Sequence, residues 1–172
     1  TLTGFTMNLS KMGEESGDSK TIRFFQKLSE KYGIGIGFGY ISKEENGMGE
    51  NHFVIVNKGT IQADYSKIHP FTYAKENEFY QGGHDLKRFD MGDMTFGMYI
   101  CYDLRFPSIF TAQAKKCHAM IVIANWPSMR EEHWRTLLRA RAIENQCYMI
   151  GVNRAGEGNG ITYPNHSSLV ID

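Results

Sequence analysis

Apolar and polar positions in the first part of the chain predict one helix followed by a strand. Between Lys20 and Tyr32 the apolar residues recur every three or four positions, as on one face of a helix, and Gly33 is a suitable stop. Residues 33–41 then alternate with a strict period of two, which predicts a strand. The glycines superficially resemble a phosphate-binding loop, but no helix follows them. A strand that packs closely against a neighbour is the better interpretation.

The residues that follow predict an antiparallel meander. Residues 44–49 have the composition of a turn, and His52 to Val56 read as a second strand. Lys58 and Gly59 form a tight connection to a third strand around Ile61.

The second half of the chain alternates strands and helices, which predicts sheet layers covered by helices and parallel pairing among the later strands. A capping-box pattern at 128–131 marks the start of its longest helix. The predicted elements are a hairpin at 89–100 that turns at 91–93, a short helix at 107–116, a buried strand at 119–124, a helix from 128 to about 146, and a strand at 147–153.

Composition adds the broad class of protein. With 172 residues, 41% hydrophobic and 22% charged, the chain is expected to form one soluble globular domain over residues 1–172. Nineteen basic and nineteen acidic residues leave no net charge, so nucleic acid is not expected as a partner. No apolar run is long enough to span a bilayer, so a membrane is not expected either. The three cysteines at 101, 117 and 147 are odd in number and widely spaced, which favours a reducing cytoplasm over a disulfide framework.

Cys101 is the candidate nucleophile. It follows an apolar, strand-like run and enters a turn that Pro107 then carries into a helix. A nucleophile needs this placement, held by a rigid strand at its tip and close to backbone N–H groups.

Lys67 and the glutamates that follow it are the next candidates. Lys67 is expected to end a strand, before a loop limited by a proline, so its ammonium could point toward a developing oxyanion. Glu76 and Glu78 come shortly after it, and one of them could face the same site. The alternative for all three is a solvated loop position.

Other polar and aromatic residues are weaker candidates. His69 or His84 could pair with the thiol as in papain-like enzymes, although neither context demands it. The histidines are too scattered to predict a metal site. Asn125 and Trp126 follow a buried strand, where open sheets build pockets, and a core tryptophan is an equal alternative. In the long helix the polar residues are expected to fix it against the sheet through buried pairs; they are Arg139, Glu144 and Asn145.

Several stretches together resemble the nitrilase or carbon–nitrogen hydrolase superfamily. The sequence is most similar to its omega-amidase-like branch, which deamidates 2-oxo acid amides. The matching stretches occur in family order and run along the whole chain. They are Thr-Gly-Phe-Thr-Met-Asn at 3–8, Tyr-Ser-Lys-Ile-His-Pro-Phe at 65–71, Cys-Tyr-Asp-Leu-Arg-Phe-Pro at 101–107, Asn-Trp-Pro at 125–127 and His-Trp-Arg-Thr-Leu-Leu-Arg-Ala-Arg-Ala-Ile-Glu-Asn-Gln at 133–146.

The resemblance implies a Glu–Lys–Cys triad with a second glutamate. By motif, Cys101 is the nucleophile, Lys67 the triad lysine and Glu76 the second glutamate, with Glu78 as the alternative. The backbone N–H of Tyr102 is expected to assist at the oxyanion. The triad glutamate would precede Thr1. The chain also lacks a starting methionine and stops after a strand-like run at 168–172, so both ends are expected to be cut. The pocket would include Phe5, Asn125 and Trp126.

The resemblance also implies a fold and a substrate class. The expected fold is α/β, a four-layer α-β-β-α sandwich of the nitrilase type that is incomplete in this chain, in a protein that forms homodimers. The expected substrate is a small amide that carries a carboxylate, such as 2-oxoglutaramate or 2-oxosuccinamate, hydrolysed without metal or organic cofactor. The alternatives are hydrolysis of a nitrile or N-carbamoyl substrate, an inactive fragment or binding module, and a thiol-redox role.

Overall fold

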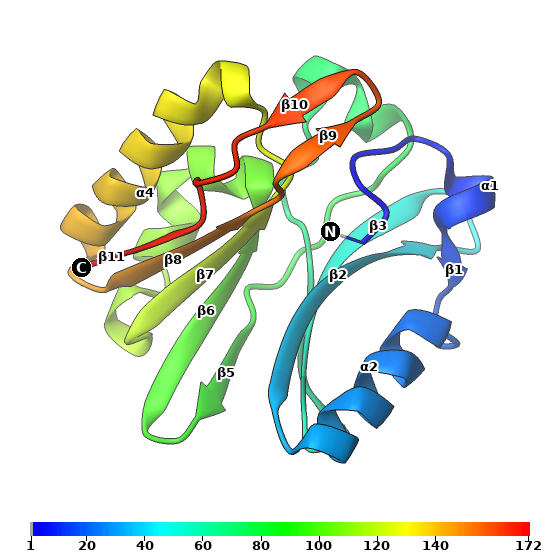
Figure 1. The fold of residues 1–172 in the computed structure, drawn as a ribbon, viewed down its shortest axis with the longest axis horizontal. Coiled ribbons are helices and arrows are strands. Elements are labelled where there is room, and N and C mark those ends of the chain that lie inside the picture. The colour runs from blue at the N-terminus through cyan, green and yellow to red at the C-terminus, as the bar shows by residue number, and fades with distance from the viewer. Residues whose placement is uncertain (1) are drawn as a thin grey trace. The chain divides into compact units, whose positions relative to one another are not determined.

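The computed structural model describes residues 2–172, which form two compact units at residues 2–89 and 90–172. Each unit has its own β-sheet and a helix that packs on it (Figure 1). No helix in the described range is both long and apolar enough to cross a bilayer.

The first unit is built on an antiparallel meander. Strands β2, β3 and β4 pair antiparallel in that order, and the short β1 adds to β2 in parallel. The meander predicted from the alternation is therefore confirmed. The elements of this unit are α1 (Leu9–Met12), β1 (Glu14–Glu15), α2 (Lys20–Tyr32), β2 (Gly35–Lys43), β3 (Gly49–Asn57), β4 (Thr60–Ser66) and the 3-10 turns Thr72–Ala74 and Glu76–Glu78.

Helix α2 covers one face of this sheet. Ser19 caps its start by accepting a hydrogen bond from the Ile22 N–H, and Gly33 ends it in the left-handed conformation, as predicted. The core beneath it joins Ile22, Phe25 and Ile36 to Phe38, Tyr40, Val54 and Val56.

Gly37 of β2 packs closely against the neighbouring strand. A Cβ at Gly37 would lie 2.9 Å from Ile55 Cδ1, so a larger residue would collide with the neighbouring strand. This contact supports the strand interpretation over a phosphate loop.

The second unit is built on a mostly parallel sheet of order β11-β8-β7-β6-β5. Strands β6, β7 and β8 are parallel, as predicted, and β11 runs antiparallel to β8. The elements are β5 (Arg88–Met91), β6 (Met94–Ile100), a 3-10 turn (Cys101–Arg105), α3 (Pro107–Thr111), a 3-10 turn (Ala114–Lys116), β7 (Ala119–Ala124), a 3-10 turn (Ser128–Arg130), α4 (Glu131–Asn145), β8 (Tyr148–Asn153), β9 (Gly156–Gly158), β10 (Ile161–Tyr163) and β11 (Leu169–Ile171).

Helix α4 packs directly on β8. A Cβ at Gly151 would lie 2.5 Å from Leu138 Cδ1 and 2.7 Å from the Trp134 ring, so the helix rests on bare backbone at this point. Arg141 fixes the helix through its Nη2, which donates to the Leu104 carbonyl at 2.9 Å. Asn145 is buried as expected, whereas Arg139 is exposed. Arg141 therefore has the buried role that the sequence analysis gave to Arg139.

Two local predictions in this unit are wrong. Residues 128–130 wind as a 3-10 turn, and α4 begins after Arg130 without a side-chain cap, because the Glu131 N–H donates to the Ser128 carbonyl instead of the Ser128 side chain. The predicted capping box is therefore absent. The short helix predicted at 107–116 is split into α3 and a 3-10 turn.

Candidate active site

Cys101 lies at the carboxyl edge of the parallel sheet. It follows Ile100, which pairs with Ile123 of β7, and the next strand over, β8, reaches the same edge at Asn153. Because parallel strands end together, three chain segments leave the sheet beside one another here.

The Cys101 backbone has an unusual conformation. Its φ is 47°, in the left-handed region that residues other than glycine rarely adopt. The turn is closed by the fully buried Asp103, whose Oδ2 accepts from the Ile100 N–H at 3.0 Å. A strained residue between a strand and a helical turn is a common way to project a nucleophile. The half-buried thiol side chain fits that placement.

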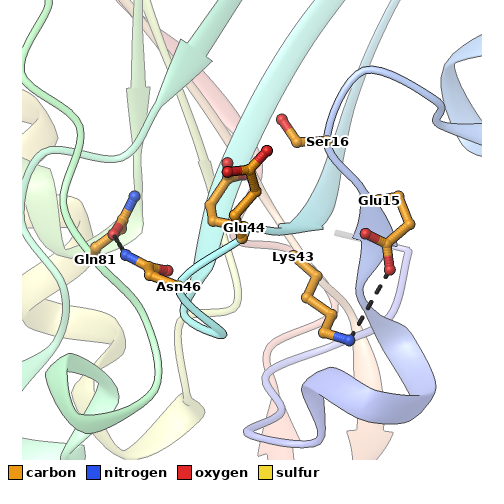
Figure 2. A pocket seen from close by; sticks show the side chains of 7 residues that line it. Glu15, Ser16, Lys43, Glu44, Asn46 and Gln81 are labelled. Carbon is orange, nitrogen blue, oxygen red and sulfur yellow. Dashed lines mark hydrogen bonds and ion pairs between the residues drawn. The ribbon is translucent and has the colours of Figure 1, made fainter.

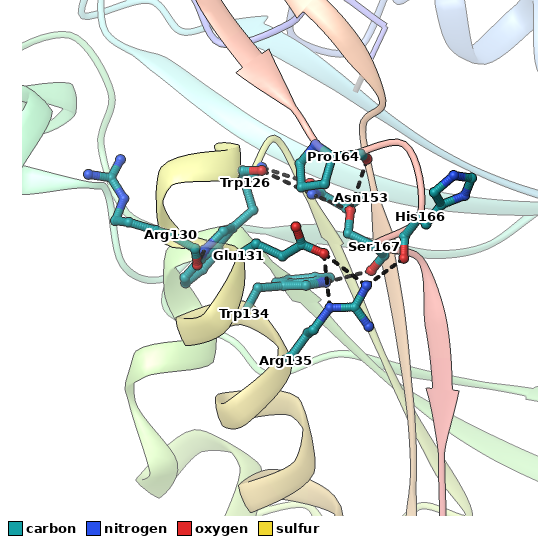
Figure 3. A network of polar contacts seen from close by, with 9 residues as sticks. All are labelled: Trp126, Arg130, Glu131, Trp134, Arg135, Asn153, Pro164, His166 and Ser167. Carbon is teal, nitrogen blue, oxygen red and sulfur yellow. Dashed lines mark hydrogen bonds and ion pairs between the residues drawn. The ribbon is translucent and has the colours of Figure 1, made fainter.

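Asn153 holds the segment that leaves β7. Its Oδ1 accepts from the Trp126 N–H at 2.7 Å, and its Nδ2 donates to the Trp126 carbonyl at 3.0 Å and to Ser167 Oγ at 2.9 Å. Trp134 Nε1 donates to the Ser167 carbonyl at 2.7 Å, which extends the network to α4 (Figure 3). The backbone of Trp126 is thus fixed by one side chain through both of its polar groups.

Trp126 itself belongs to the buried core of this edge. Its ring is 3% exposed and lies 5.4 Å from the Trp134 ring, between centroids. The Arg105 guanidinium lies 5.2 Å from the Trp126 ring centroid. Asn125, beside it, is half-buried.

In the first unit, Lys67 and Glu76 form a buried ion pair. Lys67 Nζ lies 2.7 Å from Glu76 Oε2, and the two side chains are only 4% and 2% exposed. Glu76 also accepts from Asn51 Nδ2 at 2.6 Å and from the Phe71 N–H. The carboxylate therefore holds the ammonium in place while its own oxygens are satisfied.

Of the other residues predicted for this site in the first unit, some lie near this pair and others lie on the surface. Phe5 lies beside Phe71, with ring centroids 6.5 Å apart, and Phe71 donates to Glu76. Glu78 is on the surface, where it pairs with Lys75 at 3.5 Å. His69 is half-buried and His84 is exposed. The structure thus places Glu76, rather than Glu78, against Lys67.

A second polar cluster surrounds His52 in the same unit. His52 Nδ1 lies 2.7 Å from Asp64 Oδ1, and its Nε2 lies 3.0 Å from Ser42 Oγ. Ser42 donates to Glu44 Oε1 at 2.5 Å. Glu44, Glu50 and His52 offer ligand atoms within 4.8 Å of one another, the spacing of a metal site. Both ring nitrogens of His52 already have protein partners, so the arrangement needs no ion to satisfy it.

A cavity of about 530 Å³ lies next to this cluster and contains none of the predicted site residues (Figure 2). The Lys43–Glu15 pair, 3.9 Å apart, spans one side of it, and Asn46 donates to Gln81 at 2.8 Å on the other. Its walls are polar and largely exposed. We therefore assign no catalytic role to this hollow. The lining residues are Glu15, Ser16, Lys43, Glu44, Glu45, Asn46 and Gln81.

Three residues of the two sites were missed by sequence reasoning. Asn51, which contacts Glu76, lies in the middle of a strand pattern and carries no local signal. Asn153 is the last residue of β8 and Arg154 follows it, and only the position of polar residues at the end of a parallel strand could have indicated them.

Two proteins of similar sequence are named as amidases. The 2-oxoglutaramate amidase of Bacillus subtilis is 33% identical over 173 residues, covering 99% of this chain and 66% of that protein. The omega-amidase YafV of Yersinia enterocolitica is 31% identical over 170 residues, covering 99% of this chain and 65% of that protein. This chain therefore spans slightly less than two thirds of the length of these relatives.

A solved structure shows the same fold. A carbon–nitrogen hydrolase superfamily protein of Xanthomonas campestris, with an arsenic adduct in its active site, superposes with a TM-score of 0.88 and 31% identity. The match covers 98% of this chain and 66% of that one. The layered α/β fold of the nitrilase type, predicted from the sequence, is thereby confirmed. Residues 2–172 also match the model of the carbon–nitrogen hydrolase family, and the chain belongs to that family.

Proposed function

We propose that this chain is the carbon–nitrogen hydrolase domain of an amidase that hydrolyses a small amide bearing a carboxylate. The observation that carries the proposal is Cys101, a thiol on a left-handed backbone position at the carboxyl edge of a parallel sheet. The relatives named as a 2-oxoglutaramate amidase and an omega-amidase support the substrate class. The proposed substrates are 2-oxoglutaramate and 2-oxosuccinamate.

The proposed reaction proceeds through a thioester. The Cys101 sulfur attacks the amide carbon, and its proton passes to a general base, for which the family resemblance implies a glutamate upstream of Thr1. The carbon–nitrogen bond breaks, and the nitrogen takes a proton and leaves as ammonia. Water then attacks the thioester, which releases the carboxylic acid and returns the thiol.

Lys67 and Tyr102 are proposed to stabilise the tetrahedral oxyanion. The ammonium supplies a full positive charge, and the Tyr102 N–H, directly after the nucleophile, supplies a hydrogen bond. Glu76 keeps the ammonium oriented through its 2.7 Å contact, which supports a positioning role for this second glutamate. Phe5, Asn125 and Trp126 are proposed to line the pocket.

The cell compartment and assembly belong to the same proposal. The cysteine usage and zero net charge support a cytoplasmic protein that acts on a small molecule, with neither nucleic acid nor membrane as partner. A homodimer is implied by the family resemblance, and light scattering on the purified protein measures it.

The test uses the full chain, including any residues that precede Thr1, and measures ammonia released from 2-oxoglutaramate. Cys101→Ala is expected to reduce turnover by about 10³-fold or more and to abolish the acyl-enzyme adduct in intact-mass spectra. Cys147→Ala is the matched control, because burial raises the pKa of the Cys147 thiol and leaves less thiolate at neutral pH.

Three results would contradict the proposal. Retained turnover in Cys101→Ala would exclude the nucleophile. A higher kcat/KM for a nitrile or an N-carbamoyl amino acid would reassign the substrate. No adduct and no ammonia with any of these compounds would favour a binding module.

A further inference from the structure

Arg154 follows β8 at the same edge of the sheet as Cys101. Its backbone N–H donates to the Ala124 carbonyl at 3.0 Å, so the pairing of β7 with β8 continues to this residue. Strand β7 alone lies between β8 and β6, the strand that ends at Cys101. Two strand spacings, about 10 Å, thus separate the two backbones. An arginine side chain and a short substrate together can span that gap.

The Arg154 guanidinium is held in place by the β9–β10 hairpin. It lies 4.8 Å from the Tyr163 ring centroid, and its Nη2 donates to the Glu157 carbonyl at 3.0 Å. A Cβ at Gly158 would lie only 2.4 Å from Nη2, so the guanidinium packs directly on the glycine backbone. A planar group fixed in this way is preorganised for binding.

No carboxylate pairs with this guanidinium within the described residues. Three other arginines each lie within 3 Å of an acidic side chain, whereas Arg154 and Arg105, both half-buried, each contact an aromatic ring instead. Arginine presents parallel N–H donors that match the two oxygens of a carboxylate. A half-buried guanidinium without a counter-charge therefore suits an anionic ligand. The three paired arginines are Arg23, Arg135 and Arg141.

The position of Tyr163 connects Arg154 with Cys101 electrostatically. Burial raises the pKa of Tyr163, the Arg154 charge lowers it, and the negative charge of the Cys101 thiolate raises it again. Tyr163, which is 3% exposed, is thus close enough to both residues to respond to their charges.

We infer that Arg154 is a specificity residue that binds the carboxylate of the substrate while the amide carbon lies at Cys101. The inference rests on the proposed amidase function and deepens it by naming the group that selects a carboxylate-bearing amide.

The first test compares two amides of similar length in the full-length protein, 2-oxoglutaramate and its methyl ester, which lacks the charge. Arg154→Ala is expected to raise KM for the acid by about 10- to 100-fold, because a charge-assisted hydrogen bond is lost, and to leave KM for the ester within about 2-fold. Arg154→Lys keeps the charge without the paired donors, and its KM for the acid is expected to lie between those of the wild type and Arg154→Ala.

The second test moves the guanidinium without removing it. Gly158→Ala places a methyl group where Nη2 lies, and the flexible arginine tip gives way while the hairpin backbone stays. We expect KM for the acid to rise by about 3- to 30-fold, with the melting temperature nearly unchanged. Gly156 has a positive φ and is left unaltered.

A binding measurement separates recognition from turnover. Calorimetric titration of Cys101→Ala with 2-oxoglutarate, the deamidated product, is expected to show binding that Arg154→Ala weakens at least 10-fold. Equal effects of Arg154→Ala on acid and ester, or a loss of acid selectivity only in Arg105→Ala, would overturn the inference and leave the amidase function standing. A wild-type protein that hydrolyses no amide would overturn both.

Discussion

Cys101 and Lys67 both follow a strand directly, yet the two units hold them by different means. The place of Cys101 is set by backbone: the register of parallel strands and a left-handed φ of 47°. The place of Lys67 is set by its side chain, which is buried in contact with Glu76. Replacing a side chain at a position that the backbone holds is expected to change the free energy of unfolding little. Replacing one partner of a buried ion pair is expected to lower it strongly.

The largest expected effect is at the buried pair. Lys67→Met leaves the Glu76 carboxylate buried without its counter-charge, and we expect the free energy of unfolding in urea to fall by about 3–5 kcal/mol. Cys101→Ala is expected to change it by less than about 1 kcal/mol.

Two variants sharpen this result. Lys75→Met breaks an ion pair whose side chains are 75% and 52% exposed, and its effect is expected to be below about 0.5 kcal/mol. Combining Lys67→Met with Glu76→Gln is expected to regain part of the lost stability without restoring activity. An unchanged midpoint of urea unfolding for Lys67→Met would refute the contrast between a position held by the backbone and one held by a buried ion pair.

A smaller effect is expected where a side chain supports the backbone-held edge. Asn153→Ala leaves the N–H and carbonyl of Trp126 without their partner, a loss of about 1–3 kcal/mol. Tryptophan fluorescence should shift because Trp126 lies in the same network. Asn165→Ala, in an exposed loop, is the control, and an equal effect from it would argue against a specific clamp.

Helix α2 offers a still smaller effect. Ser19→Ala removes the side chain that caps the Ile22 N–H, and a loss of about 1 kcal/mol is expected in chemical denaturation. Ser16→Ala, nearby and exposed, should be silent. Equal stability of the two variants would show that the cap contributes nothing.

The smallest expected effect is a change in how the stability of the fold depends on pH. Burial raises the pKa of Glu14, but hydrogen bonds from Ser19, Thr21 and the Lys20 backbone outweigh it and hold the pKa below its ordinary value of 4.5. A depressed folded pKa adds stability above pH 4.5 that is lost as the pH falls through the folded value. Glu14→Gln should flatten the stability curve on the acid side and leave its slope near pH 7 unaltered. A slope identical to that of the wild type below pH 4.5 would contradict this assignment.

Local periodicity predicted elements well where one face is apolar. Helix α2 has the predicted bounds because its apolar spacing and Gly33 are local features. The parallel pairing of β6 to β8 followed from the alternation of strands and helices. The capping box failed because the Glu131 N–H, which the Ser128 side chain would cap, donates to the Ser128 carbonyl in a 3-10 turn.

Site residues were predictable when a motif carried them. Lys67 and Cys101 lie in stretches that resemble the family, whereas Glu76 was chosen over Glu78 only by its place in the loop after Lys67. The 2.7 Å contact between Lys67 and Glu76 was not visible in any spacing rule. Asn51 and Arg154 depend on pairing partners 25 and 9 residues away in the chain, Glu76 and Tyr163. Such contacts are set by tertiary packing, which no local pattern encodes.

The cluster around His52 also bears on how hydrolases are found in structures. Ser42, His52 and Asp64 have the hydrogen-bond spacing of a serine-protease triad, at 3.0 and 2.7 Å. Ser42 is fully buried, however, and donates its only proton to Glu44, so the hydroxyl neither meets an electrophile nor passes a proton to the histidine. A distance-based template search would nevertheless select this trio as a catalytic centre. Direction of proton donation and access to substrate are therefore better filters than distance for recognising a nucleophile.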